Sequence, residues 1–449
     1  MGRQLFGTDG IRGVAGEYPL DAKTIRSFGN ALGAWASRTA KAHGINAPEV
    51  VIGMDTRESG PWIAEQVAGG LARQGVAVRS AGVTTTPGVA CLTRMEDFVA
   101  GVMISASHNP YQDNGLKVFD HSGFKLPDEE EHRLEQAIFD GLQNGLAPEP
   151  QPLTPDPGLD HHYLEYLAST FPGRLDGMKI VVDAANGGAF EIAPALFERL
   201  GAEVIRTACK PDGRNINKDC GALHTDSLRS AVLQHKADFG AAYDGDADRC
   251  MAISAGGKLI DGDHALLIVA RRMAEQGRAP KAVVATVMSN LGLERALTAR
   301  GIRLVRTAVG DRYVLEELLK SDLPIGGEQS GHVIFREYAT TGDGVLTSLR
   351  ILEAMRGSGQ TLEELTREFV VYPQKLVNVR FKQKRPLEEL PGVQAEIRSA
   401  EAAFGDAGRV LVRFSGTEPL ARVMVEGPEL GAVEQHARRI ASALEAELG

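Results

Sequence analysis

The chain has 449 residues, enough for about three domains of ordinary size or for four small ones. Lys and Arg number 49 against 59 Asp and Glu, and the resulting formal net charge of -10 argues against nucleic acid or an anionic membrane surface as the main partner. The four cysteines show no Cys-x-x-Cys spacing, the N-terminus has no apolar leader, and no apolar run reaches membrane-spanning length. We therefore expect a cytoplasmic protein.

Short runs rich in Val and Ile alternate with amphipathic stretches, which is typical of α/β units. Strands are predicted at residues 50–54, 76–81, 179–183 and 282–287, and helices from about residue 61, at 190–200 and at 291–299. Each unit opens with a strand, a polar or glycine-containing turn and a helix. We interpret the three openings as divergent copies of one α/β unit.

Each copy also contains a strand that ends in an unusual polar loop. The strand at residues 98–104 runs into Ser105-Ala-Ser-His-Asn-Pro110, and the strand at residues 239–243 runs into Asp244-Gly-Asp-Ala-Asp-Arg249. The third copy carries Pro324-Ile-Gly-Gly-Glu-Gln-Ser-Gly-His332. Open α/β sheets bind ligands in loops beyond the carboxyl ends of their strands, so three such loops would enclose one cleft.

Composition also suggests where the domains divide. A Pro-rich linker at residues 147–158 follows the first unit, and a second boundary falls near Tyr372-Pro373. The tail beyond it contains a strand at residues 375–381, a helical stretch, a hairpin near 414–419 and a final helix from about Glu429. We therefore predict four domains, at residues 1–155, 156–256, 257–371 and 372–449.

Ser107 is expected at the tip of the first loop, because Asn109-Pro110 prevents the chain from continuing as a regular strand or helix. By itself this loop fits a capping serine as well as a reactive one. A second loop, which begins at Asp244, favours the reactive serine. Its sequence is suited to binding a cation, and no other group in the chain obviously needs that cation.

Asp244, Asp246 and Asp248 alternate with small residues directly after an apolar strand. In an extended chain these like charges would share one face and repel one another, and a bound divalent cation such as Mg²⁺ removes that objection. An EF-hand is excluded, because its glycine and glutamate positions hold Arg249 and Ala255. A solvated acidic turn is the alternative. Three carboxylates rarely saturate Mg²⁺, so we expect an oxygen from elsewhere, such as a phosphate, to complete the shell.

The C-terminal hairpin offers a candidate phosphate site. Arg413 supplies a guanidinium fork, Ser415 and Thr417 supply hydroxyls, and Gly416 leaves the backbone N–H groups accessible. An ordinary hairpin turn with a surface arginine is the alternative. No Walker loop occurs in the chain, which disfavours nucleotide-dependent phosphoryl transfer.

The loop of the third copy mixes hydrogen-bond donors and acceptors, as a polyhydroxyl ligand requires. Its candidate residues are Glu328, Gln329, Ser330 and His332. His332 also fits a structural role at the start of a strand. Four other histidines have no chemistry-bearing neighbours in sequence and are expected at the surface or in linkers: His132, His161, His162 and His264.

Four motifs, Ser-Ala-Ser-His-Asn-Pro, Asp-Gly-Asp-Ala-Asp-Arg, Gly-Glu-Gln-Ser-Gly-His and Arg-Phe-Ser-Gly-Thr-Glu-Pro, follow one another along the chain. In this order they resemble the α-D-phosphohexomutases over essentially the whole length. The resemblance implies three similar mixed-sheet α/β domains and a smaller α+β C-terminal domain around a central cleft. It implies a phosphosugar substrate, a monomer or homodimer, a phosphoserine at Ser107, and one Mg²⁺ held by that phosphate with the three aspartates. The Arg413 turn would grip the phosphate at the far end of the sugar.

Within the family, the resemblance is to the bacterial branch that acts on glucosamine phosphates. It rests on Leu5-Phe-Gly-Thr-Asp-Gly-Ile-Arg-Gly13, Met288-Ser-Asn-Leu-Gly292, Val309-Gly-Asp-Arg-Tyr313 and Gln329. Ala247 departs from that branch, which more often has glycine there. The implied reaction interconverts glucosamine 6-phosphate and glucosamine 1-phosphate through a sugar 1,6-bisphosphate, and feeds the synthesis of UDP-N-acetylglucosamine and cell-wall precursors.

The implied phosphoserine and metal site need further residues around them, for which the sequence offers candidates, Arg12 among them by analogy with the family. Arg249 would offset charge on the moving phosphoryl group together with Mg²⁺, and Arg12 would lie near the phosphoserine. Lys117 and His108 are the candidates for the general acid–base group, and His332 is a weaker one. Arg422 joins Arg413 as a candidate phosphate ligand.

Three other functions are open from the sequence. A mutase for glucose or mannose phosphates would use the same residues. A phosphosugar-binding protein that has lost turnover would not need Ser107, the aspartates and Arg249 together. A phosphatase with Asp244 as nucleophile would leave the Ser107 loop without a role.

Overall fold

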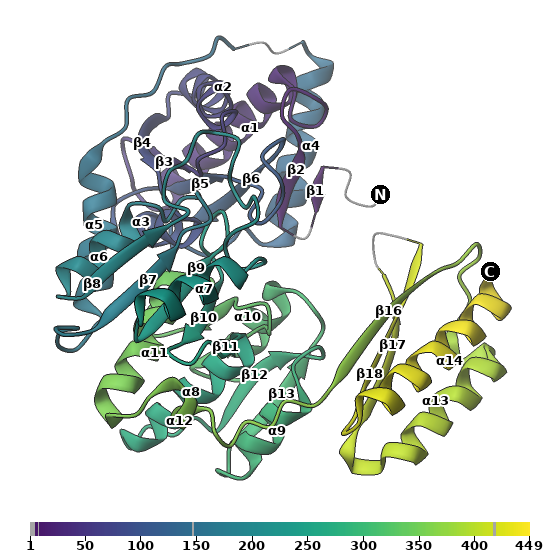
Figure 1. Cartoon of the computed structure of the whole chain (residues 1–449). Coiled ribbons are helices and arrows are strands. Elements are labelled where there is room, and N and C mark those ends of the chain that lie inside the picture. The colour runs from purple at the N-terminus through teal and green to yellow at the C-terminus, as the bar shows by residue number, and fades with distance from the viewer. Residues whose placement is uncertain (1–4, 8, 146–147, 416–418) are drawn as a thin grey trace. The chain divides into compact units, whose positions relative to one another are not determined.

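The computed structural model describes residues 5–7, 9–145, 148–415 and 419–449. The chain divides into two compact units, one of Met1–Val287 with Val305–Thr366 and one of Met288–Leu304 with Arg367–Gly449 (Figure 1). Among the helices in the described ranges, none combines the length and the apolar character that crossing a membrane would need.

The first module of the larger unit is built on a six-stranded sheet of order β1-β2-β6-β5-β3-β4. Its strands are β1 (Phe6–Gly7), β2 (Gly10–Val14), β3 (Glu49–Met54), β4 (Ala77–Val83), β5 (Ala100–Ile104) and β6 (Asp113–Asp120). Its helices are α1 (Ala22–Ala42), α2 (Gly60–Arg73), α3 (Thr86–Met95) and α4 (Asp128–Gln143). Strand β3 runs parallel to β4 and β5, and β6 returns antiparallel to β5.

The second module has a five-stranded sheet of order β11-β10-β9-β7-β8. Its elements are α5 (Pro157–Ser169), β7 (Lys179–Asp183), α6 (Ile192–Arg199), β8 (Glu203–Thr207), α7 (Asp226–His235), β9 (Phe239–Tyr243), β10 (Cys250–Ser254) and β11 (Leu259–Ile260).

The third module has a four-stranded sheet of order β13-β12-β14-β15. Its elements are α8 (Gly262–Glu275), β12 (Ala282–Thr286), β13 (Arg303–Thr307), α10 (Asp311–Lys320), β14 (Ile325–Gly327), β15 (Val333–Phe335), α11 (Gly344–Ser358) and α12 (Leu362–Leu365).

The three modules share one arrangement of strands. The first central strand pairs in parallel with the second central strand, and the second then turns into an antiparallel neighbour. That turn joins β5 to β6, β9 to β10 and β14 to β15, so the loops with Ser107, Asp244 and Glu328 occupy equivalent places. The predicted series of similar mixed-sheet α/β domains is confirmed.

Helices α1 and α2 cover the first sheet at close range. The apolar face of α1 buries Ile25, Phe28 and Leu32. A Cβ added to Gly29 would lie 2.3 Å from the carbonyl oxygen of Val67 on α2, so only glycine permits this spacing. Close packing of α2 fixes the segment directly before it, which carries Asp55 and Arg57.

The smaller unit contains a three-stranded antiparallel sheet of order β16-β18-β17, with α13 and α14 on one face (Figure 1). Its elements are α9 (Leu291–Thr298), β16 (Gln374–Arg380), α13 (Pro391–Phe404), β17 (Arg409–Phe414), β18 (Leu420–Glu426) and α14 (Leu430–Leu448), with short 3-10 turns at Leu387–Glu389 and Gly405–Ala407. Glu426 is fully buried, where its carboxylate binds Arg409 and accepts the N–H of Leu291 at 2.8 Å. The predicted α+β character of the C-terminal domain is confirmed.

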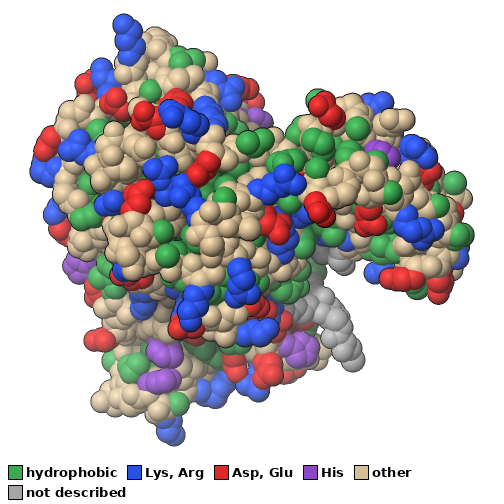
Figure 2. Space-filling view, turned by 90° about the horizontal axis from the view of Figure 1, so that it is seen from below, with side chains coloured by type: hydrophobic (Ala, Val, Ile, Leu, Met, Phe, Trp, Pro, Cys, Tyr) green, Lys and Arg blue, Asp and Glu red, His purple; other side chains and the backbone are tan. Residues whose placement is uncertain are grey.

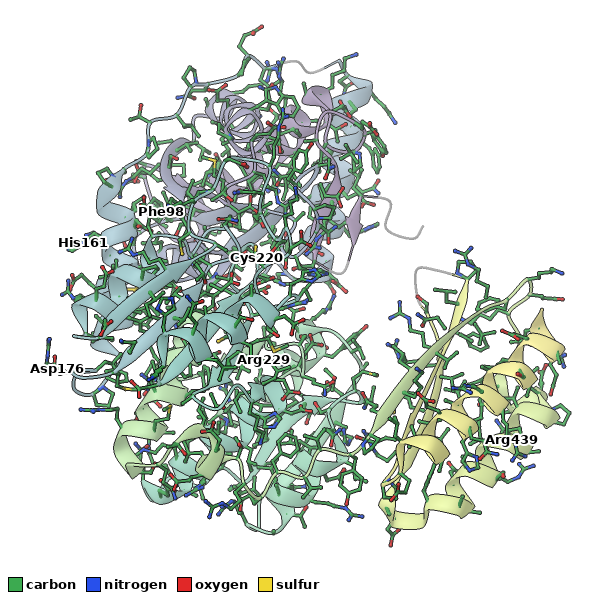
Figure 3. All side chains as sticks on the ribbon, in the orientation of Figure 1. Phe98, His161, Asp176, Cys220, Arg229 and Arg439 are labelled. Atoms are coloured by element: carbon green, nitrogen blue, oxygen red, sulfur yellow. The ribbon has the colours of Figure 1, made fainter. Side chains whose placement is uncertain are left out.

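Surface chemistry matches the acidic but mixed composition. Lys and Arg side chains are interspersed with Asp and Glu over the face in Figure 2. His161 extends outward from α5 in Figure 3, with its side chain 63% exposed, and His132 and His162 are exposed as expected. The expectation for His264 is wrong: it is 4% exposed in the first turn of α8, with Nδ1 2.6 Å from Asp261 Oδ1.

Candidate active site

Ser107 is held in a strained conformation. It has φ 52°, in the left-handed region that a residue with a Cβ rarely adopts. It is 2% exposed, and its hydroxyl donates a 2.6 Å hydrogen bond to Asp244 Oδ2 of the neighbouring module. His108 Nδ1 lies 3.4 Å from the same hydroxyl oxygen. The loop thus aims Ser107 directly at the carboxylates.

The predicted aspartate cluster is assembled in the turn between β9 and β10. Asp244, Asp246 and Asp248 are buried, and each offers a carboxylate oxygen within 4.8 Å of the others. Asp246 Oδ1 and Asp248 Oδ1 are inaccessible to solvent and accept no hydrogen bond from the described residues. Buried carboxylate oxygens without a donor are costly, and a hard divalent cation satisfies them. The donor set therefore fits Mg²⁺.

Lys117 of β6 is a buried cation that lies beside this cluster. Its Nζ lies 2.8 Å from Asp246 Oδ2, 3.0 Å from Asp9 Oδ2 and 3.8 Å from Asp248 Oδ2. Thr86 Oγ1 also donates to Asp246 Oδ2, at 2.5 Å. Two residues from the first module therefore satisfy Oδ2 of an aspartate in the second and leave its Oδ1 without a donor.

The electrostatics of the cluster differ between its members. Burial and the nearby Asp248 and Asp246 raise the pKa of Asp244 to about 8. Burial also opposes ionisation of Asp248, but His332, Lys117 and Arg249 outweigh it and lower its pKa. Burial and mutual repulsion thus oppose joint ionisation of the three carboxyl groups, and a bound divalent cation would favour it.

The two acid–base candidates lie in contrasting surroundings. Burial disfavours the charged form of Lys117, but Asp246, Asp9 and Asp248 prevail and raise its pKa, so it is an ammonium group. Burial and the guanidinium groups of Arg249 and Arg12 lower the pKa of His108 to about 4. Lys117 is thus suited to neutralising charge, whereas His108 is a neutral imidazole.

Both predicted arginines border the cluster. Arg249 Nε lies 3.8 Å from Asp248 Oδ1, and its backbone N–H donates to Asp244 Oδ1 at 3.2 Å. Arg12 pairs with Asp9 at 2.5 Å and reaches the carbonyl of Ala106 at 3.5 Å, just before Ser107.

Ala247 occupies a position that favours glycine. It is fully buried with φ 55°, and its carbonyl accepts the N–H of Gly344 at 2.9 Å. The methyl group therefore imposes the usual cost of a left-handed alanine, about 1–2 kcal/mol.

We expect Ala247→Gly to stabilise the protein by roughly 0.5–1 kcal/mol, since the relieved strain exceeds the extra chain entropy of glycine. The midpoint of thermal unfolding would rise. Ala241→Gly in β9 is the control: that alanine is buried in regular strand, so the same change should lower the midpoint. A lower midpoint for Ala247→Gly would contradict the strain argument.

The sugar-loop candidates surround the turn between β14 and β15. Glu328 Oε1 accepts the N–H of Gly310 at 3.0 Å, and Ser330 Oγ lies 3.3 Å from Glu328 Oε2. The carbonyl of Gln329 accepts the N–H of Gly262, and that of Gly331 accepts the N–H of Cys250, both at 3.1 Å. The last bond joins this loop to the end of the aspartate turn.

His332 is buried between two carboxylates. Its Nδ1 lies 3.5 Å from Asp248 Oδ2, its Nε2 lies 3.8 Å from Asp311 Oδ2, and Nε2 also faces the N–H of Gly342 at 3.1 Å. His332 therefore joins the aspartate turn to the start of α10, which gives it structural contacts as well as proximity to the cluster.

In the smaller unit, Arg413 of β17 and Arg422 of β18 are directly opposite one another. Burial and the charge of Arg422 lower the pKa of Arg413. Two facing guanidinium groups repel each other, and an anion relieves that repulsion. Ser415 directly follows β17, and its backbone N–H donates a 2.7 Å hydrogen bond to the carbonyl of Leu420 on β18. The candidates Gly416 and Thr417 lie outside the described residues.

Sequence reasoning missed an ion-pair chain beside the cluster. Lys125 Nζ lies 2.5 Å from Asp9 Oδ1 and 2.6 Å from Asp311 Oδ2, so it joins the first module to the third. Beyond this pair is a cavity of about 280 Å³ bordered by Phe124, Leu315 and Ile334. Asp9 and Asp311 both occur in motifs that the sequence singled out, but no local pattern pairs them with Lys125.

Comparison with known proteins shows which family has this order of domains. Models of phosphoglucomutase/phosphomannomutase match four successive stretches: alpha/beta/alpha domain I at residues 3–144, domain II at 161–257, domain III at 261–372 and the C-terminal domain at 376–443. The chain belongs to the phosphoglucomutase/phosphomannomutase family. The resemblance to α-D-phosphohexomutases seen in the sequence is thereby confirmed.

Relatives in the phosphoglucomutase/phosphomannomutase family match from end to end. The phosphoglucosamine mutase of Solibacter usitatus is 58% identical over 450 residues, covering 100% of both chains. A family protein from Burkholderia thailandensis shares the fold with a TM-score of 0.79 and 23% identity, covering 98% of this chain and 97% of that one. N-acetylphosphoglucosamine mutase of Aspergillus fumigatus, solved with GlcNAc-6P and magnesium, has a TM-score of 0.67 and 20% identity, covering 99% and 96%.

Proposed function

We propose that the protein interconverts glucosamine 6-phosphate and glucosamine 1-phosphate. The observation that carries this proposal is the 2.6 Å contact between the strained, buried Ser107 hydroxyl and Asp244, beside two carboxylate oxygens without a hydrogen-bond donor. We infer the identity of the sugar from the similarity to a phosphoglucosamine mutase that is 58% identical over the whole chain.

Asp244, Asp246 and Asp248 would hold one Mg²⁺, with an oxygen of a phosphate on Ser107 as a further ligand. Bound there, the ion would offset negative charge on the phosphoryl group. The Aspergillus structure named above contains magnesium, in keeping with this assignment.

The reaction would run through phosphorylated Ser107. An oxygen of the free 1- or 6-hydroxyl forms a bond to phosphorus, the bond from phosphorus to Ser107 Oγ breaks, and the serine oxygen takes up a proton. The attacking hydroxyl loses its proton to a protein base. His108, with Nδ1 3.4 Å from the serine oxygen, would exchange the proton at that oxygen as it leaves or attacks phosphorus. The resulting 1,6-bisphosphate turns over, and its other phosphate returns to Ser107 by the reverse steps.

Positioning and charge neutralisation dominate such a transfer. Lys117, Arg249 and Arg12 supply positive charge around Ser107. The loop at Glu328, Gln329, Ser330 and His332 would bind the sugar hydroxyls.

Phosphorus NMR tests the proposal. The protein, Mg²⁺ and a catalytic amount of hexose 1,6-bisphosphate are mixed with glucosamine, glucose or mannose 6-phosphate, and formation of each 1-phosphate is followed. We expect fastest conversion of the glucosamine substrate. Fast conversion of glucose or mannose 6-phosphate without conversion of glucosamine 6-phosphate would favour the alternative mutase, and no conversion of any of them would favour a binding protein.

Arg413→Ala tests the phosphate site of the smaller unit. A charge-assisted hydrogen bond contributes about 1.5–3 kcal/mol, so we expect KM for the phosphosugar to rise roughly 10- to 100-fold. Arg439→Ala is the control, because that arginine lies on α14 in the same unit and pairs with Glu396 at 2.8 Å. An unchanged KM for Arg413→Ala would remove Arg413 from the site.

A further inference from the structure

Arg57 is a buried arginine that neither the sequence motifs nor the proposed reaction uses. It lies between β3 and α2, is 1% exposed, and its Nε donates to Asp55 Oδ2 at 2.9 Å. Burying a guanidinium group is costly unless its N–H groups all find acceptors. The remaining N–H groups of Arg57 face the Ser107 loop.

Four backbone carbonyls of that loop accept hydrogen bonds from this one side chain. Nη2 donates to the carbonyls of Ser107 and Asn109, both at 2.9 Å. Nη1 donates to the carbonyl of Asp113 at 2.9 Å and to that of Pro110. The loop is therefore wrapped around the guanidinium plane with its carbonyls turned inward.

The carboxylate beside Arg57 fixes the same loop from its other end. Asp55 Oδ2 accepts the hydroxyl of Ser105 at 2.6 Å, and that hydroxyl oxygen accepts the N–H of Ser107 at 2.9 Å. Both the N–H and the carbonyl of Ser107 are thus bound to one network. Because the peptide groups on either side are fixed, the direction of the Cα–Cβ bond of Ser107 is fixed as well, and the hydroxyl that it carries lies 2.6 Å from Asp244 Oδ2.

A second donor reaches the loop from the neighbouring module. The side-chain amide of Asn217, on the segment between β8 and α7, donates to the carbonyl of Ser107 at 2.9 Å and to that of Asn109 at 3.1 Å. These are the two carbonyls that Arg57 Nη2 also binds. The same segment contacts the first module again through Arg214, which pairs with Glu58 at 2.7 Å.

We propose that Arg57 and Asn217 are positioning residues, which hold the Ser107 loop in one conformation while Ser107 gives up and regains the phosphoryl group. Both act through backbone carbonyls, Arg57 through four and Asn217 through two of the same four. The inference rests on the function proposed above. A displacement of about 1 Å at a reacting atom costs on the order of 10²-fold in rate, so the effect of losing either donor falls on turnover rather than on substrate affinity.

Arg57→Lys is the first test, since it keeps the positive charge and removes the planar fork. One ammonium group cannot serve Asp55 and four carbonyls in this geometry. We expect kcat to fall about 10- to 100-fold with KM changed less than about threefold. Amide hydrogen exchange in residues 105–113 should become faster.

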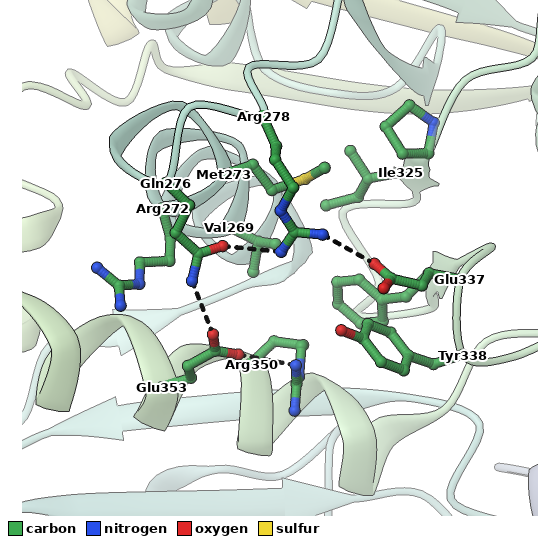
Figure 4. Close-up of a pocket in the computed structure, with 12 residues that line it drawn as sticks. Val269, Arg272, Met273, Gln276, Arg278, Ile325, Glu337, Tyr338, Arg350 and Glu353 are labelled. Carbon is green, nitrogen blue, oxygen red and sulfur yellow. Dashed lines mark hydrogen bonds and ion pairs between the residues drawn. The ribbon is translucent and has the colours of Figure 1, made fainter. Parts of the chain in front are cut away.

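The matched control is Arg350→Lys, on α11. Arg350 is 6% exposed, pairs with Glu353 at 2.7 Å and lies over the ring of Tyr338 at 4.8 Å, beside a cavity of about 40 Å³ (Figure 4). It is likewise a buried guanidinium group, and its other hydrogen-bond acceptor is the carbonyl of Thr170, outside the Ser107 loop. This variant should lose stability while its kcat and the exchange in residues 105–113 stay at wild-type values.

Asn217→Gly keeps the inference testable if Arg57→Lys fails to fold. Asn217 is half-buried with φ 59°, so glycine retains the backbone and removes only the amide. Lys236→Gly is its control, at φ 51° where α7 ends. We expect a lower kcat and faster exchange in residues 105–113 for Asn217→Gly alone.

The outcomes distinguish failure of the proposed function from failure of the positioning role. If the wild-type protein converts no phosphosugar, the proposed function fails, and the exchange measurement still tests the positioning of the loop. If the wild type turns over and folded Arg57→Lys and Asn217→Gly both retain kcat, the positioning role is wrong. A rise in KM with unchanged kcat would likewise overturn it, because it would assign these residues to substrate binding.

Discussion

Ser107→Ala is expected to lower the rate of phosphosugar interconversion by at least ~10⁴-fold, the scale of loss when a nucleophile is removed. The neighbouring hydroxyl cannot replace it, because Ser105 Oγ is buried and donates to Asp55. The fold should be retained, since alanine already occupies a buried left-handed position at residue 247 in the adjacent loop.

Two measurements check this result. Phosphorus NMR follows turnover, and intact mass follows the gain of one phosphoryl group after incubation with a hexose 1,6-bisphosphate. The wild type should carry the extra mass and Ser107→Ala should not. Ser27→Ala removes another buried hydroxyl, which donates to the carbonyl of Ile138 at 2.8 Å, and should cost about 1 kcal/mol of stability without loss of turnover. Labelling of Ser107→Ala would point to a different nucleophile, with Asp244 the first to test.

The sequence was informative wherever structure depends on neighbours along the chain. The apolar runs at β5 and β9 and the polar loops after them were predicted from local pattern. The meeting of Ser107 with Asp244 followed from a general rule, because equivalent strands of similar α/β units present their loops at one edge.

What could not be predicted depends on contacts between distant segments. Arg57 lies 50 residues before Ser107 in the sequence. The two residues meet because β3 pairs with β5 and because α2, which follows Arg57, packs tightly against α1. Asn217 reaches the Ser107 loop from the second module, and Lys125 reaches Asp311 of the third module from the first. No periodicity in the sequence encodes either approach. His264 looked like a surface residue because its partner, Asp261, was not recognised as the cap of α8.

Asp244→Asn should separate the stability of the aspartate turn from its function. The carboxylates of Asp244, Asp246 and Asp248 are buried together, so without a cation their repulsion destabilises the fold. Asparagine keeps the shape: its carbonyl can accept the N–H of Arg249 while its amide faces Ser107 Oγ. Without metal, we expect the variant to be more stable than the wild type by on the order of 1 kcal/mol, or a few degrees in the unfolding midpoint.

Mg²⁺ should reverse that order. A ligand that binds only the folded state stabilises it in proportion to RT ln(1 + [L]/Kd), so the wild type should gain about 2.7 kcal/mol at a Mg²⁺ concentration 100 times Kd. The variant lacks one anionic ligand, so its gain should be far smaller, and its turnover should fall on the order of 10²- to 10³-fold. Asp160→Asn is the control: burial raises the pKa of that carboxyl to about 6, but it is not part of the cluster and should leave the Mg²⁺ gain unchanged. If Asp244→Asn responds to Mg²⁺ as the wild type does, Asp244 is not a metal ligand, and its role reduces to orienting the Ser107 hydroxyl.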